Sequence, residues 1–305
     1  MSEFKNQTFN ELVQDLINDA FYLEDRSPRG KISTIRQYAE VIVRRILNVS
    51  NDEFVTLGSR KILDKIKEET NNNKFLLESL ENICKLGNEC THTQSTGIIS
   101  KDDVKEVIDN LFNLYAYMLI RYFEKYEFGS NMDIVSSFSI LPPIIRYITL
   151  EYLNREFPEN ILIIDKLCLA TLKAFDKEQA IEWIKARREE LEKTNVYTEE
   201  SKQDLIRQVG EDAAEVMLSN IPNMYNLCQD RINNVAQIIE EKGRLYEDFE
   251  GARNLYYEKG IVQGDTEEIV EFNSIMEFLY LGREAKENIL LAERYSYFVI
   301  EDMCL

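Results

Sequence analysis

Polar residues that could act on a phosphate gather between positions 85 and 92, in the stretch KLGNECTH. His92 is the sole histidine among 305 residues. An unperturbed imidazole has a pKa of about 6.5, so it can exchange a proton with a hydroxyl group at neutral pH. Asn88 lies four residues before His92, and Lys85 lies seven residues before it. These three residues form the candidate catalytic set.

A second polar group lies earlier in the chain, at Arg36, Glu40 and Arg44. Residues spaced by four lie in one row along a helix, so two cations would flank one carboxylate. This row is the candidate site for binding RNA or a nucleotide. The alternative is an ordinary surface row of ion pairs, which would contribute little to stability.

His92 also has a purely structural interpretation. Gly87 could end a helix, because glycine readily turns left-handed after the last helical residue. An imidazole close to such an end could hydrogen-bond the free carbonyl groups, or lie there favourably as a cation. In that case His92 and Asn88 would close a helix and take no part in chemistry.

Several established kinds of site are excluded by their missing residues. The chain has no GxxxxGK[ST] loop for nucleoside triphosphates and no GxGxxG loop. Cys84, Cys90 and His92 provide too few ligands at the spacing of a zinc site. One histidine cannot supply the paired Glu-x-x-His motifs of a di-iron bundle. We therefore expect no metal and no cofactor.

The elements that position these residues are expected to be helices. Apolar residues make up 44% of the chain and charged residues 30%, while Gly (11) and Pro (5) are scarce. Such a composition favours long helices with few tight turns. Apolar residues recur at helical spacing over 9–22, 32–46, 57–69, 75–86 and 100–125. Ser100 with Asp103 resembles a capping box at the start of the last of these helices. The sequence predicts an all-α protein.

Two helical domains are expected. The stretch EFGSNMD (127–133) combines glycine with small polar residues, so it predicts a boundary between a bundle over 1–127 and an irregular α-helical domain over 133–305. Helix starts within the second domain are expected at Pro142-Pro143, Asp176, Thr198, Pro222 and Asp265.

The charge of the chain is acidic and unevenly distributed. The formal net charge is −19; residues 1–130 carry 17 basic and 21 acidic side chains, and residues 131–305 carry 19 and 34. A net charge of −15 on the second half repels phosphate backbones and suits a basic protein partner. RNA or a nucleotide would therefore bind the first half. A solvated helical surface is the simpler explanation of the acidity.

Targeting signals are not apparent. The N-terminus shows no basic start followed by an apolar run, and no uncharged apolar stretch is long enough to span a membrane. The five cysteines are scattered and odd in number, which indicates reduced thiols. We expect a cytoplasmic protein without membrane contact.

The first half resembles the HEPN superfamily, the small helical bundles of prokaryotic defence and toxin systems. The likeness covers residues 10–126 and is carried by IRQYAEVIVRRILN (35–48), LGSRKILDKI, LENICKLGNECTH and the capped helix that follows. The run Leu86-Gly87-Asn88, with His92 four residues after the asparagine, is the more specific part. Residues 131–305 show no such likeness.

The resemblance implies a metal-independent ribonuclease that works as a homodimer. HEPN nucleases use an Arg-x4-6-His motif, and the motifs of two protomers usually meet in one cleft. Here Gly87 stands five residues before His92, where the family has arginine, and Lys85 is the cation nearest in sequence. Lysine lacks the planar fork of arginine and substitutes poorly in bidentate phosphate binding.

Three functions follow as predictions. The first is an interaction or regulatory protein of an antiviral defence or toxin–antitoxin system, with a degraded catalytic motif, a dimeric N-terminal bundle and a protein partner on its acidic half. The second is a ribonuclease that uses His92 with Lys85 or the arginines at 36 and 44. The third is a module that binds nucleotides without cleaving them.

Overall fold

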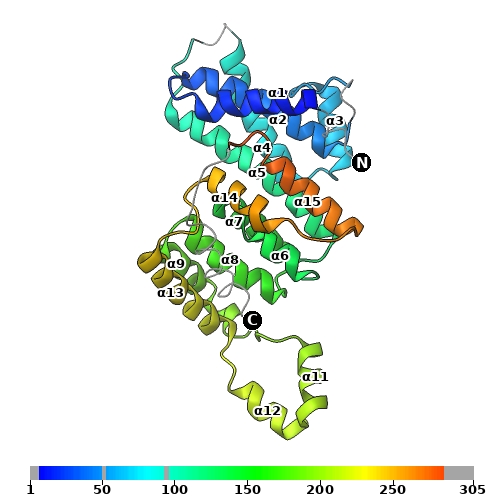
Figure 1. The fold of residues 1–305 in the computed structure, drawn as a ribbon, viewed down its shortest axis with the longest axis vertical. Coiled ribbons are helices and arrows are strands. Elements are labelled where there is room, and N and C mark those ends of the chain that lie inside the picture. Colours follow the sequence, from blue (N-terminus) through cyan, green and yellow to red (C-terminus); the bar gives the residue numbers. More distant parts are fainter. Residues whose placement is uncertain (1–6, 50–52, 93–95, 285–305) are drawn as a thin grey trace. The chain divides into compact units, whose positions relative to one another are not determined.

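The computed structural model describes residues 7–49, 53–92 and 96–284 (Figure 1). These residues form 15 α-helices and two short π-helical turns, and they contain no strand, which confirms the all-α prediction. They separate into two compact units. The first unit contains residues 7–126 and 249–284, and the second contains residues 127–248.

Helices from the first 126 residues build most of the first unit. They are α1 (Gln7–Ile17), the π-helical turn η2 (Asn18–Tyr22), α2 (Pro28–Ile46), α3 (Arg60–Glu69), α4 (Lys74–Thr91) and α5 (Lys101–Lys125). Helices α2, α4 and α5 pack on one another around a buried apolar core. The expected capping box is present, because Ser100 and Asp103 exchange hydrogen bonds at the start of α5. Five helices of ten or more residues, α1 to α5, thus form the bundle that holds the candidate site.

A segment distant in sequence completes this unit. It consists of α14 (Phe249–Leu255), the π-helical turn η3 (Tyr256–Gly260) and α15 (Glu267–Leu279). Helix α15 packs on α5, where the rings of Tyr122 and Phe272 lie 5.4 Å apart. Residues 249–284, expected in the second domain, therefore pack with the first. Helical periodicity shows which face of a segment is buried but does not reveal its partner, so the sequence could not detect this return.

The second unit is a separate helical assembly. It comprises α6 (Met132–Phe138), α7 (Pro143–Glu156), α8 (Ile161–Ala174), α9 (Lys177–Ala186), α10 (Arg188–Leu191), α11 (Glu199–Val209), α12 (Glu211–Ser219) and α13 (Met224–Lys242). Helices α8, α9 and α13 share one apolar core that includes Cys168, Ile184 and Ile232. Asp165 is fully buried in α8 with its carboxylate 2.7 Å from Arg231.

Most predicted helix starts are confirmed. Pro143 begins α7, and Asp176 and Thr198 cap α9 and α11 with their side chains. Helix α15 is capped by Thr266 rather than by the expected Asp265, because the threonine hydroxyl accepts the backbone N–H of Ile269. Helix α13 begins after Asn223, one residue beyond the expected proline.

Candidate functional site

The three candidate catalytic residues lie on the second half of α4. Lys85 is exposed, Asn88 is half-buried, and His92 is exposed at the residue that ends the helix. Positions separated by three and seven residues share one helix face, so the three side chains leave α4 on the same side. The structure thus places them on one side of the same helix. The backbone N–H of His92 donates to the carbonyl of Asn88 (3.0 Å).

The structural interpretation of His92 expected Gly87 to end the helix, and this expectation is wrong. Helix α4 continues to Thr91, and Gly87 is buried where α4 meets α2. A Cβ atom at position 87 would lie 2.9 Å from both the Cβ and the Cγ of Arg36, and closer still to its Cδ. The absence of a side chain lets the two helices approach. The packing of α4 on α2 therefore requires glycine at position 87.

The row on α2 forms a clamp on the backbone of Leu57. The guanidinium of Arg36 donates from Nη2 to the carbonyl of Leu57 (3.0 Å), and the Glu40 carboxylate accepts from the N–H of the same residue (2.9 Å). Both polar backbone groups of Leu57 are thus satisfied by one helix. Arg44 continues the row and is half-buried. Two of the three residues proposed to bind RNA are used to hold a connecting segment in place.

Removing the carboxylate of this clamp should cost measurable stability. We expect Glu40→Ala to lower the free energy of unfolding by about 2 kcal/mol, because the N–H of Leu57 loses a charged acceptor. Glu40→Gln keeps an acceptor oxygen and should lose clearly less. Chemical denaturation followed by circular dichroism would compare them. Equal losses for the two variants would contradict the clamp.

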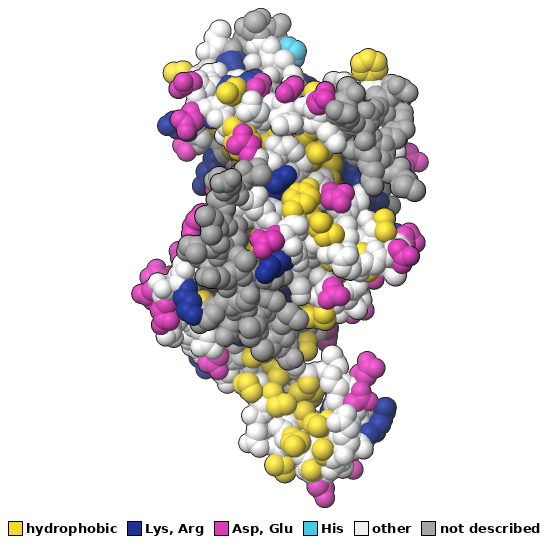
Figure 2. Space-filling model, viewed as in Figure 1, with side chains coloured by type: hydrophobic (Ala, Val, Ile, Leu, Met, Phe, Trp, Pro, Cys, Tyr) yellow, Lys and Arg dark blue, Asp and Glu magenta, His cyan; other side chains and the backbone are white. Residues whose placement is uncertain are grey.

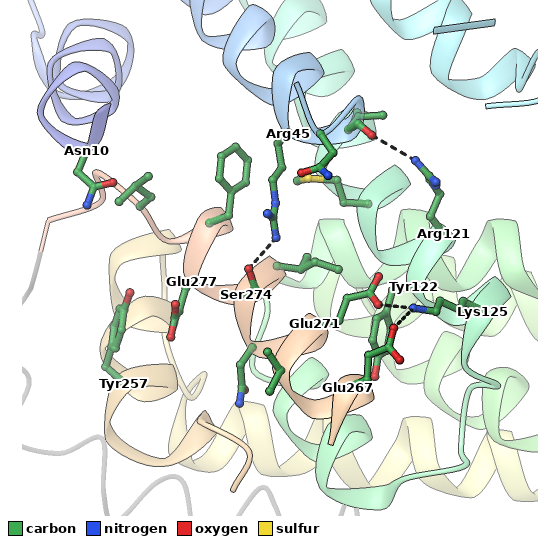
Figure 3. A pocket seen from close by; sticks show the side chains of 18 residues that line it. Asn10, Arg45, Arg121, Tyr122, Lys125, Tyr257, Glu267, Glu271, Ser274 and Glu277 are labelled. Carbon is green, nitrogen blue, oxygen red and sulfur yellow. Dashed lines mark hydrogen bonds and ion pairs between the residues drawn. The ribbon is translucent and has the colours of Figure 1, made fainter. Parts of the chain in front are cut away.

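A pocket of about 1100 Å³ lies in the first unit between α15 and the ends of α2 and α5 (Figure 3). Lys125 closes one end through ion pairs with Glu267 (3.0 Å) and Glu271 (2.7 Å), which raise the pKa of Lys125. The guanidinium of Arg45 donates a hydrogen bond to the hydroxyl of Ser274 (2.7 Å). Burial lowers the pKa of Arg45.

The charges of this pocket balance. Its cations are Arg45, Arg121 and Lys125, and its carboxylates are Glu267, Glu271 and Glu277. Balanced charge and internal pairing give no concentrated positive field for a polyphosphate. The pocket therefore adds little support to the nucleotide-binding prediction.

An exposed apolar surface lies on α11 and α12 of the second unit. Residues 198–222, hereafter the arm, contain these two helices, which are joined at Gly210. Among the described elements, α11 and α12 pack mainly on each other. Figure 2 shows hydrophobic side chains gathered over the arm. Exposed fractions are 40% for Val209, 63% for Val216, 52% for Met217 and 40% for Ile221.

Helix α12 is apolar on two faces. Ala214 is buried and Leu218 is half-buried, while Ala213, Val216 and Met217 face solvent at i, i+3 and i+4 spacing. A helix whose apolar residues surround most of its circumference is normally covered on more than one side. For the two helices of the arm, the start at Thr198 was the one feature predicted from the sequence. The two apolar faces within EDAAEVMLSNI were the signal that could have found the surface.

Comparison with known proteins found no matching family model, no matching curated protein and no matching solved structure. Within the described ranges, no group of three or more His, Cys, Asp or Glu side chains could hold a metal ion. No described helix combines the length and the apolar character that crossing a membrane requires.

Proposed function

We propose that this chain is an interaction or regulatory protein that acts by binding a protein partner. The observation that carries the proposal is the arm, where four large apolar side chains on two short helices and just after them are 40% or more exposed. Contiguous exposed apolar surface on a folded protein commonly marks a binding site. The resemblance of residues 10–126 to HEPN bundles supports a place in a prokaryotic defence or toxin–antitoxin system, and a homodimer through that bundle.

A catalytic role for the HEPN-like face has weaker support. Arg36 directs its guanidinium to the carbonyl of Leu57, and Gly87 is needed for the approach of α4 to α2. The arginine that would stabilise charge on a phosphorane is thus missing from the motif, and its nearest substitute on α2 is engaged elsewhere. A ribonuclease needs a cation and a proton-transfer group in near contact with one phosphate.

The ribonuclease remains a second candidate because Lys85, Asn88 and His92 share one side of α4. We expect the purified protein to leave single-stranded and structured RNA intact, at a level indistinguishable from His92→Ala. A gel assay with end-labelled RNA over the pH range 5–8 would measure this. Cleavage by the wild-type protein that disappears in His92→Ala would establish the ribonuclease and overturn the interaction-only function.

The partner itself is the direct test of the proposed function. The tagged full chain would be isolated from its native cells, and co-purifying proteins would be identified by mass spectrometry. The complex would then be rebuilt from the two purified proteins, and its mass measured in solution. We expect a complex of defined stoichiometry. A chain that forms no complex with any candidate after purification would refute the proposal.

A further inference from the structure

We propose that the arm binds a basic amphipathic helix of the partner protein. The inference rests on the proposed function and names its docking surface and the chemistry of the partner. The arm offers an apolar surface shared by two helices, an exposed carboxylate (Asp212) at the edge of that surface, and a net negative charge. A helix with one apolar stripe and flanking Lys or Arg residues would match both features.

The apolar residues of the arm have the spacing of a helix contact. On α12, Ala213, Val216 and Met217 form a stripe at i, i+3 and i+4. On α11, Leu205 and Ile206 are half-buried and Val209 is 40% exposed, so packing against α12 covers this face only in part. Residues at such spacing meet the ridge of a neighbouring helix. A third helix could therefore pack against both helices of the arm.

The arm also has little core of its own. Helices α11 and α12 contain 11 and 9 residues, and Ala214 is the single residue of these two helices that is buried. Isolated helices shorter than about 12–15 residues are marginal in water, and most helix stability in proteins comes from packing of an apolar face. A bound helix would supply that packing. We therefore expect binding to increase the order of the arm.

Charge selects the kind of partner. Residues 198–222 contain six acidic and two basic side chains, a net charge of −4, and Arg207 is already paired with Asp204 (2.9 Å). Asp212 is exposed on α12 four residues before Val216, so it lies at the edge of the exposed apolar stripe, while Glu211 and Glu215 leave the helix on its far side. This field attracts cations and repels other acidic surfaces. A second copy of the arm, an anionic membrane and a nucleic acid are all disfavoured by the same charge.

The test uses the full chain and three labelled peptides of about 18 residues, a length of about 27 Å as a helix. The first peptide has leucines on one helical face and lysines on the other. The second carries glutamates in place of the lysines, and the third has the Leu/Lys composition in an order without an apolar face. Fluorescence anisotropy would measure binding. We expect the first peptide alone to bind, and its affinity to fall as salt is raised.

Matched variants locate the binding surface. The double variant Val216→Asp/Met217→Asp should weaken binding of the Leu/Lys peptide by about tenfold or more, because both central apolar contacts are lost. Ile98→Asp makes the same kind of change at a residue of the first unit that is 96% exposed, and should bind like the wild type. Asp212→Asn should weaken binding and reduce its salt dependence while leaving the apolar stripe intact.

Several results would overturn the inference. These are equal binding of all three peptides, no binding of the Leu/Lys peptide, and equal binding by the wild type and both arm variants. Arm-dependent self-association, or arm-dependent binding to vesicles of anionic lipid, would assign the surface to another occupant. If the rebuilt partner complex survives the arm variants, the docking inference fails while the proposed function stands. If the Leu/Lys peptide binds but no partner complex forms, the proposed function fails, while the arm is still shown to bind a basic amphipathic helix.

Discussion

Replacing Arg283 with methionine is expected to lower the free energy of unfolding by about 3–5 kcal/mol. The Arg283 side chain is only 4% exposed, and its guanidinium lies 3.6 Å from the carboxylate of Glu250. Removing one partner of a buried pair leaves the other charge desolvated without compensation, which costs far more than the intact pair contributes. The variant would leave the buried Glu250 carboxylate without its cation and with the Tyr22 hydroxyl as a remaining hydrogen-bond donor.

The surroundings of Arg283 explain why methionine cannot replace it. The guanidinium lies 4.2 Å from the ring centroids of both Phe21 and Phe249, so it packs between two aromatic faces. A desolvated cation over an aromatic ring gains favourable electrostatic energy that an apolar side chain does not reproduce. Tyr22 donates its hydroxyl proton to Glu250 and accepts the backbone N–H of Glu284. The arginine thus connects η2, α14 and the end of the returning segment.

Buried tyrosines around this arginine stay neutral. Burial raises the pKa of Tyr38 and of Tyr115, whose hydroxyl groups are hydrogen-bonded at 2.8 Å. Burial and the hydrogen bond to Glu250 raise the pKa of Tyr22 to about 12. None of these phenols therefore provides a negative charge near neutral pH. The carboxylate of Glu250 is the one that pairs with Arg283, and the prediction depends on this pairing.

Two control variants separate the buried charge from a general effect of losing an arginine. Arg60→Met removes an exposed arginine of the same unit, whose side chain is 95% exposed, and should change stability by less than about 0.5 kcal/mol. Arg283→Lys keeps the charge but loses the planar group between the rings, so an intermediate loss is expected. Urea denaturation followed by circular dichroism would rank the three. A loss for Arg283→Met as small as that for Arg60→Met would contradict the buried pair.

Local signals in the sequence were sufficient for the helices and their ends. Ser100 with Asp103, Asp176 and Thr198 cap helices as expected, because capping depends on neighbours within one turn of the chain. The return of residues 249–284 to the first unit depends on contacts between residues more than 100 positions apart, such as Tyr122 with Phe272 and Tyr22 with Glu250. Periodicity within a segment contains no information about such partners.

At the candidate site, too, the sequence predicted contacts within one helix but not contacts between distant segments. Lys85, Asn88 and His92 could be placed together from spacing on one helix. The clamp of Arg36 and Glu40 on Leu57 could not, because it joins a helix to a connecting segment about 20 residues away. Gly87 was expected to end a helix, since glycine commonly does so. Its actual role depends on the position of α2, which no local pattern specifies.

Placing at position 87 the arginine of the HEPN motif, through Gly87→Arg, is expected to destabilise the protein by more than about 4 kcal/mol and to yield no ribonuclease. Even a Cβ atom at this position would lie 2.9 Å from the Cβ and Cγ of Arg36. A full arginine would have to separate α2 from α4, and would place a second guanidinium beside the one that holds Leu57. Overpacking and burial of an unpaired charge both oppose folding.

Alanine at the same position isolates the steric part of this effect. Gly87→Ala should lower the free energy of unfolding by about 1–3 kcal/mol, although alanine favours a helix by about 1 kcal/mol over glycine. Gly97→Ala is the matched control, because a Cβ there meets no atom within 4 Å. Thermal and urea denaturation would rank the variants, and an RNA assay would follow for those that fold. A stable Gly87→Arg protein that cleaves RNA through His92 would show that the HEPN-like face is an active site lacking a single side chain. A destabilised one would show that the packing of α2 on α4 excludes an arginine at this position.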